Sequence, residues 1–133
     1  MDKVGKGRSA NSGTDKMGKS AEEIACKFLE ERGFIIIERN WRHHHLEVDI
    51  FAVERCHREI LHLIEVKGRA SSSYTEPSRL VGIVKQRNLI NAARGYLYRK
   101  HLDYEVVFDL IIVIFSGGGH EISFIQNAFK PIW

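Results

Sequence analysis

The chain has 133 residues, of which 44% are hydrophobic and 28% charged, and its formal net charge is +3 at pH 7. This length is typical of one domain, and the composition excludes a disordered, collagen-like or disulfide-scaffold protein. No segment approaches the ~18 consecutive apolar residues of a membrane-spanning helix, so we expect no membrane partner. The two cysteines have no CxxC spacing and are typical of reduced thiols in a cytoplasmic protein.

The positive charge is concentrated at the N-terminus. Residues 1–19 hold five basic residues against two acidic ones, whereas residues 20–133 hold 15 of each sign. Residues 1–14 contain glycine, serine and basic residues and almost no apolar ones, so we predict a disordered basic tail there and a single domain over residues 15–133. Such a tail is either a solvated terminus or a loose contact for a polyanion.

The first predicted element is a helix over residues 20–32. Its apolar residues recur at helical spacing, Ser20 with Glu23 matches a capping box, and Gly33 is a suitable stop. The alternative is a start one turn earlier, near Asp15, which would weaken the capping argument.

Three β-branched segments follow and predict strands over residues 34–38, 46–53 and 59–67. The short polar link between the last two predicts an antiparallel hairpin. A loop over residues 68–76 leads to a helix from Pro77 to about Lys100, and two further strands cover residues 105–115 and 121–126. The order α-β-β-β-α-β-β predicts an α/β fold, with a mixed sheet of about five strands flanked by helices.

Charged residues interrupt the predicted hairpin. Residues i and i+2 of a strand share a face, so Glu65 and Lys67 lie together, and the hairpin brings Asp49 close to them. Two carboxylates form a hard-oxygen site for Mg²⁺, which activates water and stabilises charge on a phosphate, and a lysine can orient the nucleophile. The same residues are also typical of a cross-strand charge group on a solvated face, and both interpretations remain open on the residues alone.

Four segments together resemble the YraN-like family of small bacterial proteins. They occur in the family's order over residues 17–129. The first two segments are Gly18-Lys-Ser-Ala-Glu-Glu-Ile-Ala25 and Asn40-Trp-Arg42, and the third combines Glu47-Val-Asp-Ile50 with Ile64-Glu-Val-Lys-Gly-Arg69. The fourth runs from Val84 to Leu97 and continues with Phe108-Asp-Leu110 and Gln126 to Phe129. Their joint occurrence is far more specific than any one of them. The chain departs from the family pattern at Ala21, Leu46, Val48 and Val107.

The resemblance implies the restriction-endonuclease-like fold, whose active sites follow the PD-(D/E)xK pattern. It also implies similarity to archaeal Holliday-junction resolvases, which add a Glu from the first helix. Carried over by position, the pattern falls on Asp49, Glu65 and Lys67, and the helix Glu falls on Glu22. The implied roles are that Asp49, Glu65 and Glu22 hold Mg²⁺ or Mn²⁺, while Lys67 orients the attacking water and Glu22 alternatively helps as a base.

Three further cations are candidates for nucleic-acid contact: Arg42, Arg69 and Lys85. Lys85 lies between Val81 and Leu89 on the sheet-facing side of its predicted helix. It either reaches the site or a phosphate, or extends its stem beside the core towards solvent.

Other polar and aromatic residues have mainly structural interpretations. Asp109 interrupts an apolar strand and is expected to be a structural carboxylate paired with Lys85 or an arginine. His43 to His45 alternate in direction and have no zinc-like spacing, so we expect an exposed loop. Trp41 is expected at the edge of the core, with contact to nucleic acid as the alternative.

The sequence therefore predicts a Mg²⁺- or Mn²⁺-dependent nuclease that hydrolyses DNA, including branched or structured DNA. Two alternatives are a nucleic-acid-binding module that has the same fold without turnover, and a protein-interaction domain. Junction-resolving relatives act as dimers, so the resemblance implies by analogy that this chain forms a homodimer.

Overall fold

The structure, a computed structural model, describes residues 12–73 and 75–131. Its elements in chain order are α1 (Ser12–Glu31), β1 (Phe34–His43), β2 (Leu46–Glu54), β3 (His57–Ala70), the 3₁₀ turn η2 (Pro77–Arg79), α2 (Ile83–Lys100), β4 (Glu105–Ser116) and β5 (Gly119–Ile125). The predicted order and the five-stranded mixed sheet are confirmed. In the part of the chain that the structure describes, no helix is long and apolar enough to cross a membrane.

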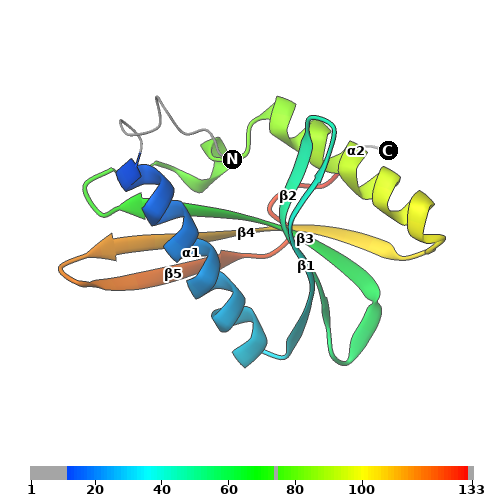
Figure 1. Ribbon diagram of the computed structural model, residues 1–133, viewed down its shortest axis with the longest axis horizontal. Helices are drawn as coiled ribbons and strands as arrows, with labels where there is room; N and C mark the ends of the chain where they lie inside the picture. The colour runs from blue at the N-terminus through cyan, green and yellow to red at the C-terminus, as the bar shows by residue number, and fades with distance from the viewer. Residues whose placement is uncertain (1–11, 74, 132–133) are drawn as a thin grey trace.

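The strands are ordered β1-β2-β3-β4-β5, so β3 is the central strand (Figure 1). The antiparallel hairpin predicted between the second and third strands is confirmed as β2–β3, and β1 extends it antiparallel. Helix α2 then carries the chain over to β4, which pairs parallel to β3 from Ile60↔Glu105 to Ala70↔Phe115. Strand β5 returns antiparallel to β4. Because β3 has a neighbour on each side, its residues 61–66 are buried.

The two helices cover opposite faces of the sheet, and Figure 1 shows α1 crossing in front of it. On the α1 face, Ala25 and Leu29 pack in one apolar cluster with Ile64 and Val66. On the α2 face, Leu89, Ala93 and Tyr96 pack in a second cluster with Phe51, Leu63 and Leu110. Successive residues of a strand point to opposite faces, so Leu63, Glu65 and Lys67 share the α2 side of β3.

The first helix begins earlier than the favoured prediction. It starts at Ser12, so Ser20 lies inside it and the predicted capping box is wrong. Packing supplies the reason, because the carbonyl oxygen of Met17 would lie 3.2 Å from a side-chain carbon placed at Gly68 of β3. Helix α1 therefore already lies close to β3 at Met17, before Ser20 is reached. Of the predicted basic tail over residues 1–14, residues 1–11 lie outside the described residues, and 12–14 belong to α1.

The second predicted helix is two separate elements. Pro77 opens only the short turn η2, and α2 begins at Ile83. Gly82 between them is extended, with φ −71° and ψ 174°, which interrupts helical hydrogen bonding. The strands, by contrast, are longer than predicted, because the β1–β2 pairing continues to His43↔Leu46 and the β3–β4 pairing continues to Ala70.

Candidate functional site

The β2–β3 hairpin brings the two predicted carboxylates together. Ile50 is paired with Ile64, so Asp49 lies beside Glu65 at the next position along the two strands. The Oδ2 atom of Asp49 accepts a hydrogen bond of 2.8 Å from the backbone N–H of Val66. This bond fixes one oxygen of the carboxylate, and it uses a backbone amide that no side-chain pattern in the sequence could have identified.

Glu65 is a buried charge with two lysine neighbours. Its residue is only 4% exposed, and its Oε2 atom lies 3.0 Å from Nζ of Lys67, while Oε1 lies 3.5 Å from Nζ of Lys85. Oε1 nevertheless has no hydrogen-bond partner. Buried polar oxygens are rarely left in this state, because losing water without a replacement costs about 1–3 kcal/mol. One oxygen of Glu65 is therefore open to a further partner.

The pKa of Asp49 is raised from 3.8 to about 7. Burial is the largest cause, followed by repulsion from Glu65 and, more weakly, from Glu22, while the Val66 hydrogen bond and Lys85 oppose the rise. Around neutral pH Asp49 is therefore close to the midpoint of its ionisation, and its negative charge is disfavoured by burial and by Glu65. Such an acidic pair favours a bound cation or a proton.

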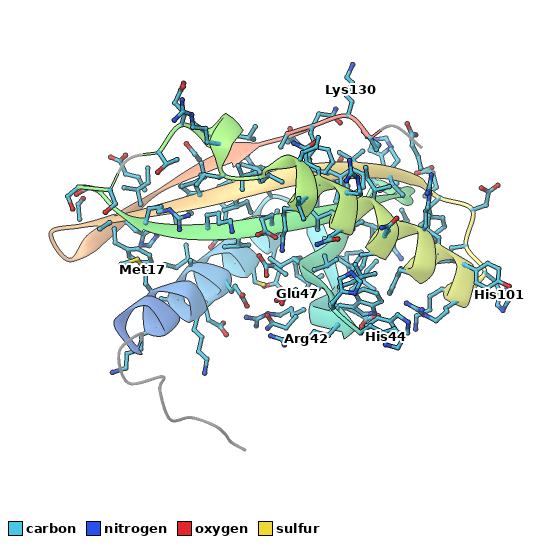
Figure 2. The ribbon with its side chains drawn as sticks, turned by 90° about the horizontal axis from the view of Figure 1, so that it is seen from above. Met17, Arg42, His44, Glu47, His101 and Lys130 are labelled. Atoms are coloured by element: carbon cyan, nitrogen blue, oxygen red, sulfur yellow. The ribbon has the colours of Figure 1, made fainter. Side chains whose placement is uncertain are left out.

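Glu22 comes to the site from a different element, helix α1. Its negative charge raises the pKa of Asp49, so the two carboxylates are within electrostatic reach of each other. The close approach of α1 to β3 depends on Gly68, where a methyl group would lie 3.1 Å from the Cβ atom of Ala21. Figure 2 shows Met17, on the same helix, beside β3. Glu22 is thus held near the hairpin by helix packing.

The donor set is small for a metal held by protein alone. Over residues 12–73 and 75–131, no group of three or more His, Cys, Asp or Glu side chains is arranged so that it could hold a metal ion. Mg²⁺ is commonly bound by only one or two carboxylates, with waters and substrate phosphate oxygens completing its shell. Oε1 of Glu65 and the neighbouring Asp49 carboxyl fit that kind of ion, and Glu22 does not complete a three-carboxylate set.

The candidate phosphate-binding residues lie at different distances from this centre. Lys85 contacts Glu65, and Lys67 does so as well, with side chains that are 32% and 27% exposed. Arg69 lies two residues beyond Lys67 on β3 and donates a hydrogen bond of 2.8 Å to the carbonyl of Gly68. Arg42 instead pairs with Glu47 at 3.7 Å near the end of the β1–β2 hairpin (Figure 2).

Asp109 has a different partner from the one predicted. It is buried, and its Oδ2 atom lies 2.6 Å from Nδ1 of His62, while Oδ1 accepts a hydrogen bond from the N–H of Asn127. The predicted pairing with Lys85 or an arginine is wrong, because Asp109 faces α1 and Lys85 lies on the other face of the sheet. The structure agrees with the predicted structural role of Asp109, because its carboxylate is buried and contacts groups of two other segments. His62 was not identified from the sequence, although its place in an apolar strand was a signal for such a pair.

Trp41, His44 and His45 are placed as expected, whereas His43 lies in a strand and is half-buried beside Trp41 rather than in an exposed loop. His43 ends β1, and His44 and His45 form the exposed turn to β2, where φ of His44 is +56°. Trp41 packs edge-to-face on Phe51 and Tyr96 at the border of the α2-face cluster. The ring of Trp41 is therefore part of the packing at the edge of the core.

The fold and this centre define a mixed α/β protein with two carboxyl groups on its central hairpin, one of which is ion-paired with two lysines. The chain belongs to the uncharacterised protein family UPF0102, whose family model matches residues 21–113. This membership confirms the resemblance to the YraN-like family. The matched range contains Glu22, Asp49, Glu65, Lys67 and Lys85.

Relatives of known sequence cover most of the chain. A UPF0102 protein of Bacteroides thetaiotaomicron is 36% identical over 88% of this chain and 94% of its own length. One from Clostridium perfringens is 38% identical, covering 86% and 93%. One from Pelobacter propionicus is 41% identical, covering 85% and 81%. Their names state no activity.

Proposed function

We propose that this protein is a Mg²⁺- or Mn²⁺-dependent nuclease that hydrolyses phosphodiester bonds of DNA. The observation that carries the proposal is the open oxygen of Glu65. It is buried, it has no hydrogen-bond partner, and it lies beside Asp49, whose pKa is raised to about 7. A divalent cation would satisfy the oxygen and remove the repulsion between the two carboxylates in one step.

Asp49 and Glu65 would hold the ion, with Glu22 as a further anion close by. The bound ion would lower the pKa of a water and stabilise charge on the attacked phosphate. The amide of Val66 keeps Oδ2 of Asp49 in place, and Lys67 does the same for Oε2 of Glu65. Each carboxylate therefore has one oxygen fixed by the protein, and Oε1 of Glu65, which lies 3.5 Å from Nζ of Lys85, has no hydrogen-bond partner.

The two lysines add the positive charge that a phosphodiester substrate requires. Lys67 and Lys85 come from β3 and α2, and both side chains are partly exposed, so their ammonium groups can be reached by substrate. As the phosphate gains negative charge in the transition state, a positioned ammonium group stabilises it without reorganisation. In this role Lys67 also orients the attacking water, while Lys85 and Arg69 contact neighbouring phosphates.

The test is a cleavage panel of single-stranded, duplex, flap and four-way-junction DNA with Mg²⁺ or Mn²⁺. Glu65→Gln removes the central charge, and Glu59→Gln, an exposed glutamate on the same strand, is the matched control. We expect cleavage by the wild type and the control, and a loss of ~10²–10³ in rate for Glu65→Gln.

The same panel separates the alternatives. Salt-dependent binding of DNA without metal-dependent cleavage would point to a binding module, because phosphate contacts release counterions. Absence of both cleavage and binding would point to a protein-interaction domain. Equal cleavage by Glu65→Gln and the wild type would refute the site.

A further inference from the structure

A cavity of about 180 Å³ lies beside the carboxylate–lysine site, on the α2 side of the sheet. Its apolar wall is formed by Ile112 and Ile114 of β4 together with Leu80, and its polar rim is formed by Arg69, Ser71 and Ser123. The chain that follows β3 turns back along the sheet before it reaches α2 (Figure 1). Leu80, which belongs to this returning segment, lines the cavity together with Ile112 and Ile114 of β4.

The cavity is adjacent to the proposed catalytic residues because of the β3–β4 register. Lys67 is paired with Ile112, and Arg69 is paired with Ile114. Glu65, Lys67 and Arg69 share one side of β3, at steps of about 6.6 Å for every two residues. The apolar wall therefore begins at the level of Lys67 and continues past Arg69.

The chemistry of the cavity matches a single nucleobase. A base has flat apolar faces and a polar edge, and enzymes that receive an unstacked base hold it between apolar side chains with hydrogen bonds to its edge. A cavity of about 150 Å³ accommodates benzene, so this cavity has room for one base but not for a base pair.

The positive charges are also placed for a nucleotide. Arg69 is fixed at the rim by its hydrogen bond to the carbonyl of Gly68, which leaves most of its five N–H donors for a ligand. Lys67 lies at the other end of the same wall. A base in the cavity would thus have Arg69 at the rim, and Lys67 about 6.6 Å further along β3, as cations for its phosphates.

We propose that this cavity receives one unpaired nucleobase next to the phosphate that is cleaved. The inference rests on the proposed nuclease function and specifies its substrate class as DNA with an unpaired nucleotide at the cleavage point. A fully paired duplex must first extrude a base, whereas a bulge, flap or junction presents one at little cost.

The test is binding to a duplex that contains a single bulged thymidine, compared with the same duplex in which the bulged nucleotide is abasic. Fluorescence anisotropy is measured in EDTA, so that cleavage plays no part. Stacking of a base on protein contributes about 1–3 kcal/mol, so we expect about 5- to 150-fold tighter binding of the thymidine duplex.

Cavity-filling variants give the structural control. Ser123→Trp and Ser71→Trp start from exposed residues of the rim, and each should make the two duplexes bind equally. Ser116→Trp, at the exposed end of β4 outside the cavity, should keep the wild-type ratio. Thermal melts establish that each variant is folded.

The outcomes separate the cavity from the catalysis. Equal binding of both duplexes by the wild type, or an unchanged ratio in both rim variants, would overturn the cavity even if DNA is cleaved. Base-dependent binding without cleavage in Mg²⁺ or Mn²⁺ would support the cavity and refute the nuclease activity.

Discussion

Replacing Asp49 with Asn tests the electrostatics of the site without reference to any substrate. Asn has nearly the same shape and can still accept the hydrogen bond from the N–H of Val66. It cannot ionise, so the repulsion from Glu65 and the cost of burying a second charge both disappear. We therefore expect the variant to gain stability in metal-free solution, and the gain should depend on pH.

The sign and size of this pH dependence of stability follow from the pKa of Asp49. The folded state raises this pKa from 3.8 to about 7, so the folded protein binds the proton more tightly than the unfolded chain does. The free energy of unfolding therefore falls as pH rises from about 4 to about 7 and is constant above that range. The full effect is about 4 kcal/mol, of which about 3 kcal/mol falls between pH 5 and pH 8.

The assay is urea or thermal unfolding of both proteins in EDTA from pH 5 to pH 8. For a chain of 133 residues, 3 kcal/mol corresponds to a difference of about 10 °C in Tm. The difference in Tm between Asp49→Asn and the wild type should increase by that amount as pH rises from 5 to 8. Asp103→Asn, at an exposed aspartate, should show no such widening. Parallel pH profiles for Asp49→Asn and the wild type would refute the reasoning.

Three other substitutions test the neighbours of this carboxylate. Lys67→Met keeps most of the side-chain stem and removes the ammonium group, so the cleavage rate should fall ~10²–10³-fold while DNA affinity in EDTA changes much less. Equal losses of cleavage rate and DNA affinity would exclude a catalytic role for Lys67. Lys85→Met removes a cation that opposes the raised pKa of Asp49, so calorimetry should show tighter Mn²⁺ binding; weaker binding would contradict this. Asp109→Ala leaves His62 without its partner at 2.6 Å, and urea unfolding should show a loss of about 3 kcal/mol; a loss below about 1 kcal/mol would argue against the buried pair.

Local patterns predicted the fold well because each strand carries its own signal. β-branched runs bounded by polar links marked all five strands, and the short link before β3 was sufficient to predict the hairpin. The helix start was mispredicted because Met17 packs on β3 at Gly68, a contact between segments that are far apart in the sequence. The split before α2 was missed because the apolar spacing continues through Gly82.

The candidate site was predictable to the extent that it lies on one hairpin. Alternation placed Glu65 and Lys67 on a common side, and the hairpin register brought Asp49 to them. What the pattern could not supply was burial, which depends on how β4 and α2 cover the hairpin. For the same reason the predicted pairing of Asp109 with Lys85 was wrong, since the two residues lie on opposite faces of the sheet.

The chemical groups and their burial come from different parts of the chain. Glu22, Asp49, Glu65 and Lys67 all precede Ala70, whereas β4 and α2, which remove Glu65 from water, follow it. The β3–β4 ladder joins residues 45 apart in sequence, such as Ile60 and Glu105, and closing so long a loop makes folding slower. The first half of the chain can therefore assemble the hairpin with its carboxylates still hydrated. The second half, which contributes Lys85 to the centre, is the part that turns a solvated acidic hairpin into a buried ionic site.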